Sequence, residues 1–440
     1  MAKKISNVLN EYGKKVAETG VKIEIKPQMV PRKAITRFMK LVAINVDDPR
    51  SQNMTRYSLG QILAMAFFAV LGGELTFMDM EDFCKEHRKF LKKVLLLPDE
   101  HTPCHDTFSR VFSAIKMAQL EQVTVAVILE RLGALRKALK IDDGGMRHLS
   151  VDGKVLRGSG RKRGTDEEVP DAQALHIFSN SEGVCIATEL ISEKTNEIPV
   201  AQRLLGTLDL RNTLVSFDAL HTQQKTVAII REGKGHYVGA LKGNQQFLEQ
   251  EASLFFHEKD KLRMQGNPAE YYETVEKAHN QVEKRSFYLA KVNNKTNNVF
   301  ANWAGLKSII CYQKHMYHVV SGKETTEIRY YITSLSDVTV CADSIRGHWG
   351  VENQLHWHLD VLLGEDANMT TDRVALGNLG LIKKMVLSLY KLVQPMLKKD
   401  TSIRRVRKKF GRDFKSALAL LLSLDEKTIR EALEKATAKK

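Results

Sequence analysis

Hydrophobic residues recur at helical spacing through the first third of the chain. Between Ser58 and Leu139, apolar positions repeat every three or four residues, beginning with Leu59 and Ile62. This spacing predicts a helical N-terminal domain over residues 46–140. The preceding residues 1–45 are polar, contain lysines and show weak periodicity, which is typical of a flexible basic arm or a frayed helix more than of a packed element.

Beyond residue 145 the pattern changes to short runs of strand-forming residues. These runs are 148–152, 174–179, 184–191, 214–218 and 236–241, and helical spacing covers 198–208 and 222–232. Three strands, a helix, a strand, a helix and a strand is the element order of the ribonuclease-H-like fold. We therefore predict an α/β protein in which the all-α N-terminal domain precedes a ribonuclease-H-like catalytic domain at 145–397.

Residues 247–331 interrupt this order with alternating polar and apolar positions. The alternating runs are 286–292, 307–312 and 328–332. They predict a β-containing insertion within the catalytic domain. Helical spacing returns from about residue 344 to beyond 360, and again at 380–397. The remaining residues, 398–440, are rich in Lys and Arg at their start and predict a basic C-terminal helical tail.

The charge balance favours a polyanionic partner. The chain has 67 Lys and Arg against 52 Asp and Glu, a formal net charge of +15, so nucleic acid is the leading partner class. The alternative is a soluble protein whose surface is merely basic. Five scattered cysteines form no C-x-x-C pair, and the longest apolar run, 62–71, is far shorter than a membrane span. We therefore expect a cytoplasmic protein that does not contact a membrane.

Two aspartates stand at the ends of predicted strands. Asp152 and Asp218 each follow a hydrophobic run, where a carboxylate is costly to desolvate unless a cation binds it. Two such carboxylates from adjacent strands can share Mg²⁺, and a pair of ions clamps the attacking and leaving oxygens of a phosphodiester. The alternative is that each Asp caps the turn after its strand.

The segment from Gly347 to Asp360 supplies further candidates. If it is helical, His348, Glu352, His356 and Asp360 form one polar stripe, and Trp349, Asn353 and Trp357 line the neighbouring track. The alternative is a helix whose tryptophans fill the core. Zinc chemistry is a weaker interpretation because the H-E-x-x-H signature is absent. No Walker G-x-x-x-x-G-K-[ST] or G-x-S-x-G motif supports nucleotide hydrolysis or a serine nucleophile.

These motifs resemble a known family. Val151 to Arg157, Phe217 to Gln223, Lys242 to Gln245, and 348–366 are similar to the Rhs-linked, H-repeat-associated transposases of the ISAs insertion-sequence group. The stretch 48–107 resembles that family's helical N-terminal domain. The resemblance covers about residues 45–424.

The resemblance implies a D-D-E transposase with Asp152, Asp218 and Glu352 as catalytic and metal-binding residues and two Mg²⁺ or Mn²⁺ ions as cofactors. Glu365 or Asp366 is a reserve candidate for the third ligand. Wider relatives carry a Tyr-x-x-Arg-x-x-x-Glu-x-x-x-x-x-x-Lys signature, but the Tyr, Arg and Lys places hold Ile345, His348 and Leu359 here. The family's His-Gly-Arg-x-Glu-x-Arg stretch is only partly kept at 279–285.

The implied partners are double-stranded DNA, as terminal repeats and target, and a second copy of the chain in a homodimer on DNA. The expected location is cytoplasmic and nucleoid-associated. The residues predicted to bind DNA are Arg157, Lys242, Asn244, His348, Trp349, Asn353, His356, Trp357, Arg404, Arg405, Arg407, Lys408 and Lys409. The basic run 404–409 has a solvated helix face as its alternative. Two other functions stay open: a catalytically inactive DNA-binding descendant of a transposase, and a structure-selective nuclease.

Overall fold

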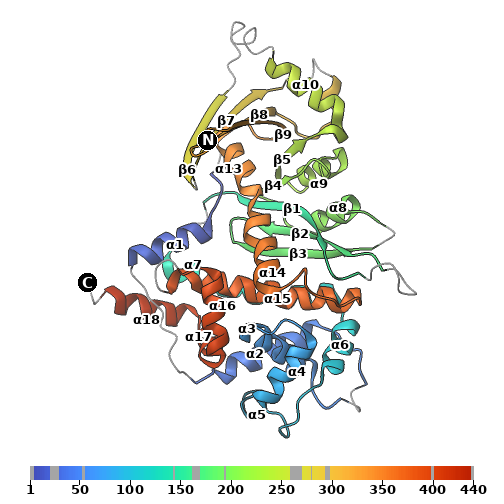
Figure 1. The fold of residues 1–440 in the computed structure, drawn as a ribbon, viewed down its shortest axis with the longest axis vertical. Helices are drawn as coiled ribbons and strands as arrows, with labels where there is room; N and C mark the ends of the chain where they lie inside the picture. The colour runs from blue at the N-terminus through green and yellow to red at the C-terminus, as the bar shows by residue number, and fades with distance from the viewer. Residues whose placement is uncertain are drawn as a thin grey trace.

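The protein has a sheet-containing half and a helical half, with one long helix between them (Figure 1). The computed structural model describes residues 4–19, 29–51, 55–141, 144–160, 169–192, 195–257, 270–278, 280–292, 298–397 and 401–437. Nine strands form one mixed sheet with the order β3-β2-β1-β4-β5-β9-β8-β7-β6. The fold is therefore mixed α/β, as predicted.

The first five strands match the runs predicted from the sequence. They are β1 (Arg147–Leu156), β2 (Ala172–Ser179), β3 (Val184–Ile191), β4 (Thr213–Phe217) and β5 (His236–Leu241). β1 to β3 are antiparallel, while β4 pairs in parallel with β1 and β5. The helices α8 (Glu197–Thr207) and α9 (Gln224–Glu232) connect the strands at the predicted places.

The predicted insertion continues the same sheet. Its strands are β6 (Glu270–Ala278), β7 (Gln281–Lys291), β8 (Ser308–His318) and β9 (Glu324–Thr333), and its helices are α10 (Gln246–His257) and α12 (Asn298–Ala301). β9 pairs with β5 antiparallel, so backbone hydrogen bonds tie the insertion to the strands that carry the candidate aspartates. The pattern predicted parts of three of these strands and missed β6, which has few buried positions.

A helical column lies on one face of the sheet. It comprises α13 (Val338–His348), a π-helical turn (Val351–His356) and α14 (Trp357–Leu363). Side chains alternate across a strand. On β4, Leu214 packs with α13, whereas Val215 and Phe217 pack in the core shared with α8 and α9. The helical column and the connecting helices therefore cover opposite faces.

The helical half shares one core with helices from both ends of the chain. Its elements are α1 (Val8–Thr19), α2 (Arg32–Asn45), α3 (Leu59–Gly72), α4 (Phe77–Glu86), α5 (Arg88–Leu95), α6 (His105–Ala114), α7 (Met117–Leu139), α15 (Arg373–Val393), α16 (Ile403–Arg412), α17 (Phe414–Leu422) and α18 (Glu426–Thr437). Short 3₁₀ turns lie at Gly243–Gln245 and Gln394–Met396. α15 lies between the two halves in Figure 1 and contacts α3, α6, α7 and β3.

The structure differs from the flexible arm expected over residues 1–45. α1 and α2 occupy much of this stretch, and α1 buries Val8, Tyr12 and Val16. These three residues are spaced by four, so they form an apolar stripe that packs as a helix face. The Tyr12 hydroxyl donates a hydrogen bond to the Leu392 carbonyl at 2.5 Å.

Membrane-crossing candidates were sought only among the described residues. No single helix there has both the length and the apolar composition to cross a bilayer, although two sharply bent helix pairs meet those two criteria jointly.

Candidate functional site

Strand alternation puts Asp152 and Asp218 on the same face of the sheet. β1 and β4 are parallel, with Val151 opposite Phe217, and both of these side chains point into the core beneath α8 and α9. The next residue of each strand therefore points toward α13. Asp152 and Asp218 accordingly line a common cavity with Ile345 of α13.

Asp152 lies within its strand, and the expectation that it ends the strand is wrong. β1 continues to Leu156 because its other edge pairs with β2 as far as Ala172. Pairing with β4, however, stops at Val151. Asp152 is therefore held rigidly on one side by β2 while its other side opens toward the cavity.

Glu352 reaches the same cavity from the π-helical turn. The backbone N–H of Trp357 donates to the carbonyl of Glu352, the i to i+5 spacing of a π-helix. Such turns are rare and frequently occur at functional sites. The wider turn changes the regular stripe that the sequence predicted, because the helix advances through more than four residues per turn here. Leu355 and His356 are buried on this turn, while Glu352 stays exposed.

The three carboxylates line one cavity of about 160 Å³. The pKa of Asp152 is raised to about 7, chiefly by burial and then by the negative charges of Asp218 and Glu352. Asp218 and Glu352 are therefore close enough for their charges to act on Asp152. A bound cation would relieve both the repulsion and the cost of burial.

The donor set suits a hard divalent ion. Carboxylate oxygens are the ligands that Mg²⁺ and Mn²⁺ prefer, and the shared cavity gives them a common space. As the side chains stand, no group of three His, Cys, Asp or Glu residues within the described ranges is arranged to hold a metal ion. Joint coordination by Asp152, Asp218 and Glu352 therefore requires their side chains to rotate toward one another.

Two further residues beside the acids were not singled out from the sequence. Glu197 begins α8, and its carboxylate occupies the space where a side chain at position 153 would project, so a larger residue than Gly153 would displace it. His221 Nε2 lies 3.4 Å from Glu197 Oε2, and its backbone N–H donates to Asp218 Oδ1 at 3.2 Å. His221 belongs to the 217–223 motif, which was a usable signal, whereas Glu197 had none.

Comparison with known proteins identifies the family. The model described as "Transposase DDE domain" matches residues 143–389, and the model described as "DDE_Tnp_1-associated" matches residues 44–127. The first of these covers more than half of the chain. The chain belongs to the DDE transposases.

Curated relatives extend over most of the transposase. The "Putative transposase YncI" of Escherichia coli is 31% identical over 373 residues, which are 83% of this chain and 89% of the relative. The "H repeat-associated putative transposase YhhI" of Escherichia coli is 31% identical over 343 residues, 76% of this chain and 84% of the relative. These matches confirm the H-repeat-associated family. Among solved structures, a piggyBac transposase synaptic complex with hairpin DNA aligns over 98% of this chain and 85% of that chain, with a TM-score of 0.36 and 12% identity.

In this transposase the reserve candidates for the third ligand are engaged elsewhere. Lys154 Nζ lies 2.7 Å from Glu365 Oε2 and 3.4 Å from Asp366 Oδ1, and it also contacts Asp360. Burial would raise the pKa of Glu365, but Lys384 and Lys154 lower it below its usual value. Neither Glu365 nor Asp366 lines the cavity that holds the other three acids.

The polar residues of the helical column contact two different parts of the sheet. His348 lines the acid cavity, and its Nδ1 lies 3.1 Å from the Ser216 hydroxyl. Burial lowers the His348 pKa to about 4, so its ring is neutral near pH 7. His356 is buried, with Nδ1 3.6 Å from Asp152 Oδ2 and Nε2 3.0 Å from His176 Nδ1. Trp349 lines the acid cavity, whereas Trp357 is about half exposed outside it.

The other residues predicted to bind DNA do not line the acid cavity. Lys242 is exposed, and Asn244 Nδ2 donates to the Ala219 carbonyl at 2.5 Å, which supports the loop after Asp218. Asn353 lines a neighbouring cavity, and Arg157 is exposed, with its backbone N–H donating to Asp366 Oδ1.

The predicted basic run lies on α16 in the helical half. Its residues Arg404, Arg405, Lys408 and Lys409 are exposed, whereas Arg407 donates to the Gly73 carbonyl at 3.0 Å. The run therefore presents four cations to solvent and uses the fifth to attach α16 to the end of α3.

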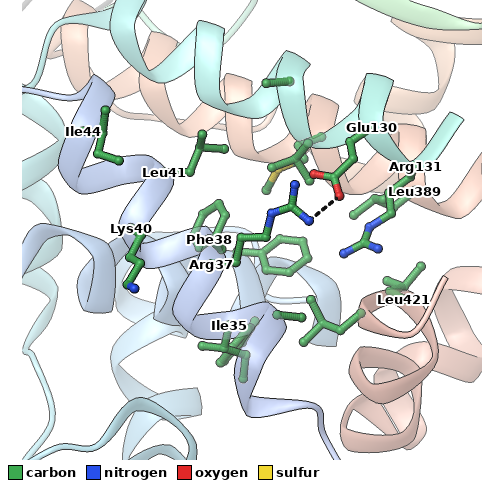
Figure 2. Close-up of a pocket in the computed structure, with 17 residues that line it drawn as sticks. Ile35, Arg37, Phe38, Lys40, Leu41, Ile44, Glu130, Arg131, Leu389 and Leu421 are labelled. Carbon is green, nitrogen blue, oxygen red and sulfur yellow. Dashed lines mark ion pairs between the residues drawn. The ribbon is translucent and has the colours of Figure 1, made fainter. Parts of the chain in front are cut away.

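The helical half also contains a cavity of different chemistry (Figure 2). It has a volume of about 280 Å³ and is lined mostly by apolar side chains of α2, α3, α7, α15 and α17. Figure 2 shows Arg37 pointing toward Glu130, and their ion pair of 3.0 Å is largely exposed. Glu130 is the only acid among the described residues that line this cavity, so the cavity offers little to a metal ion, and the acid cavity remains the candidate active site.

Proposed function

We propose that this transposase cleaves DNA at the ends of a bacterial insertion sequence and joins the freed strand to target DNA. The observation that carries the proposal is the single cavity lined by Asp152, Asp218 and Glu352. The raised pKa of Asp152 supports it, because repelling buried carboxylates are typical of a site completed by a cation. In this proposal the strands β1 to β5 form the ribonuclease-H-like core.

Asp152, Asp218 and Glu352 would hold two divalent ions, Mg²⁺ or Mn²⁺, which activate the attacking oxygen and stabilise the leaving one when bound. In the first reaction water attacks the phosphodiester, a new P–O bond forms, and the bond to the 3′ oxygen breaks to leave a 3′-hydroxyl. In the second reaction that hydroxyl attacks a target phosphodiester and displaces its 3′ oxygen. Both reactions exchange one P–O bond for another and need no external energy source.

The chain's other residues bind and orient the DNA. Rigid pairing of β1 between β2 and β4 fixes Asp152, while the Ser216 contact fixes His348 beside Asp218. Trp349 offers an exposed ring to a base at the cavity edge. The exposed cations of α16 would contact backbone phosphates and make binding depend steeply on salt. Synapsis of two element ends requires two active sites, so we expect a homodimer on double-stranded DNA.

A plasmid-nicking assay tests the proposal. Supercoiled plasmid is incubated with Mn²⁺ and the native chain, Asp152→Asn, or the matched control Asp209→Asn, whose exposed carboxylate pairs with Arg211 away from the cavity. We expect native and Asp209→Asn proteins to nick and Asp152→Asn to lose at least about a hundredfold in rate. Equal nicking by Asp152→Asn and native protein would contradict the assignment.

The same assay separates the two alternatives. Binding that weakens with salt but is never followed by cleavage would favour the inactive DNA-binding descendant. Cutting of branched or flapped DNA without any joined product would favour a structure-selective nuclease. Joined products that require a free 3′-hydroxyl support the transposase mechanism.

A further inference from the structure

The acid cavity needs a positive charge that its three carboxylates do not supply. A phosphodiester entering beside Asp152, Asp218 and Glu352 brings further negative charge. Among the described residues that line this cavity, Arg329 is the only Lys or Arg. It comes from β9 of the insertion, more than a hundred residues along the chain from Asp218.

The guanidinium of Arg329 is held in place from several sides. Its Nε donates to Glu327 Oε1 at 2.6 Å, and its carbon lies 5.2 Å from the centre of the Trp349 ring. A second nitrogen, Nη2, lies 2.5 Å from the same Glu327 oxygen. An arginine has five N–H donors in a planar fork, so these contacts leave donors for a further acceptor. The side chain is 36% exposed, which leaves the group accessible from the cavity.

The sheet carries Arg329 rigidly to this position. β4 pairs with β5, and β5 pairs with β9 through Leu241 opposite Tyr330. Continuous backbone hydrogen bonding therefore links the strand before Asp218 to the strand of Arg329. A fixed cation costs little reorganisation when negative charge develops nearby.

A second cavity continues from Arg329. Its volume is about 440 Å³, and it shares Arg329, Ile345 and Trp349 with the acid cavity. Its other charged lining residues are Arg285, Lys314, Arg346, Glu283 and Glu327. Cations outnumber acids in this lining, so the second cavity suits a nucleic-acid backbone better than the first. Glu283 and Arg285 belong to the partly kept 279–285 stretch, of which residue 279 is outside the described residues.

We propose that Arg329 contacts a non-bridging oxygen of the scissile phosphate, and that the same DNA strand continues along the second cavity past Arg285, Lys314 and Arg346. This inference rests on the proposed function and names its substrate-contacting cation. In the sequence signature of wider relatives, the Arg place holds His348 here, whose ring is bonded to Ser216. β9 of the insertion thus gives the acid cavity its guanidinium, whereas the arginine of the helical column, Arg346, lines the second cavity.

Three variants test the contact in the Mn²⁺ plasmid-nicking assay. Arg329→Met keeps length without charge, Arg329→Lys keeps charge without the fork, and Arg203→Met is the matched control because Arg203 pairs with Glu189 on another face. We expect Arg329→Met to lower kcat at least about a hundredfold with a smaller change in KM. Arg329→Lys should show only part of that loss in kcat. Free guanidinium, added below denaturing concentrations, should restore nicking by Arg329→Met. Arg203→Met should behave like the native chain.

The outcomes separate this inference from the proposed function. If Arg329→Met nicks like the native chain while Asp152→Asn does not, the Arg329 contact is contradicted and the proposed function stands. A loss that neither lysine nor guanidinium restores, or one confined to KM, would also overturn the contact, since it would reflect structure or distant binding. Absence of nicking by the native chain would overturn the proposed function and this inference with it.

Discussion

Two clusters of acidic side chains lie beside strand β1, and they differ in how far nearby cations neutralise their negative charge. Asp152 projects from β1 toward Asp218 and Glu352, and Arg329 is the one Lys or Arg among the described residues that line their cavity. Two residues later, Lys154 joins Glu365, Asp360 and Asp366 in an ion-pair cluster. The three acids of the cavity exceed its one cation, so part of their charge is uncompensated, whereas the Lys154 cluster is compensated by direct ion pairs.

The pKa directions follow this difference. Burial and the neighbouring acids raise the pKa of Asp152 to about 7, whereas Lys384 and Lys154 overcome burial and lower the pKa of Glu365. The acids paired with Lys154 stabilise the contact between β1 and α14. Asp152, a largely buried acid beside two other carboxylates, costs stability, which is typical of a site that binds a cation.

The largest expected effect separates chemistry from stability. Glu352→Gln removes one uncompensated charge, so nicking should fall at least about a hundredfold while the thermal unfolding midpoint holds or rises. Plasmid nicking and calorimetry measure the two quantities. A large drop in the unfolding midpoint would mean that Glu352 belongs to the scaffold.

Lys154→Met should have the opposite profile. It leaves Glu365 buried without its nearest cation, so the free energy of unfolding should fall by about 3 kcal/mol. Urea unfolding measures this loss. Glu365→Gln in the same background should recover part of the stability, because the uncompensated charge is removed. An unchanged midpoint in Lys154→Met would contradict the assignment of a structural cluster.

Unfolding as a function of pH distinguishes the two clusters by sign. Because the folded pKa of Asp152 is raised from 3.8 to about 7, the folded protein binds the proton more tightly, and stability falls as pH rises from about 4 to 7. Asp152→Asn should remove this fall, on the order of 2 kcal/mol, in metal-free buffer. The lowered pKa of Glu365 has the opposite effect on stability. The stability that the ionised Glu365 carboxylate contributes is lost as the pH falls below the usual pKa range of a glutamate. Parallel pH profiles for native and Asp152→Asn proteins would contradict the raised pKa.

The smallest effect concerns a buried cation on α15. Lys383 is 1% exposed, its Nζ has no hydrogen-bond partner among the residues that the structure describes, and burial lowers its pKa to about 8. Lys383→Met should therefore stabilise the transposase by about 1 kcal/mol. Urea unfolding near neutral pH checks this, and a destabilised variant would show that Lys383 has a compensating interaction.

The sequence predicted most of the sheet because its signals were local. The runs around Val151 and Phe217 are apolar and short, and the hairpin turn at 180–183 is typical. The packing of α1 was missed because its apolar positions are few among polar ones. α2 has Ile35, Phe38 and Val42 at helical spacing, so its apolar face was a usable signal that the weak overall periodicity of residues 1–45 concealed. β6 was missed for a similar reason.

The candidate site was only partly accessible to sequence reasoning. Asp152, Asp218 and Glu352 stood out because carboxylates follow hydrophobic runs or fall in an unusual His- and Trp-rich segment. Their assignment as ligands stays a prediction. Arg329 and Glu197 gave no signal, since their importance depends on strand pairing and on a close approach that only the folded chain creates.

Calorimetric titration with Mn²⁺ tests the central claim most directly. Native protein, Asp218→Asn and the compensated-cluster control Asp366→Asn are titrated in the absence of DNA. We expect saturable Mn²⁺ binding by the native and Asp366→Asn proteins and loss of Mn²⁺ binding in Asp218→Asn. Equal Mn²⁺ binding by Asp218→Asn and native protein, or loss of binding only in Asp366→Asn, would contradict that claim.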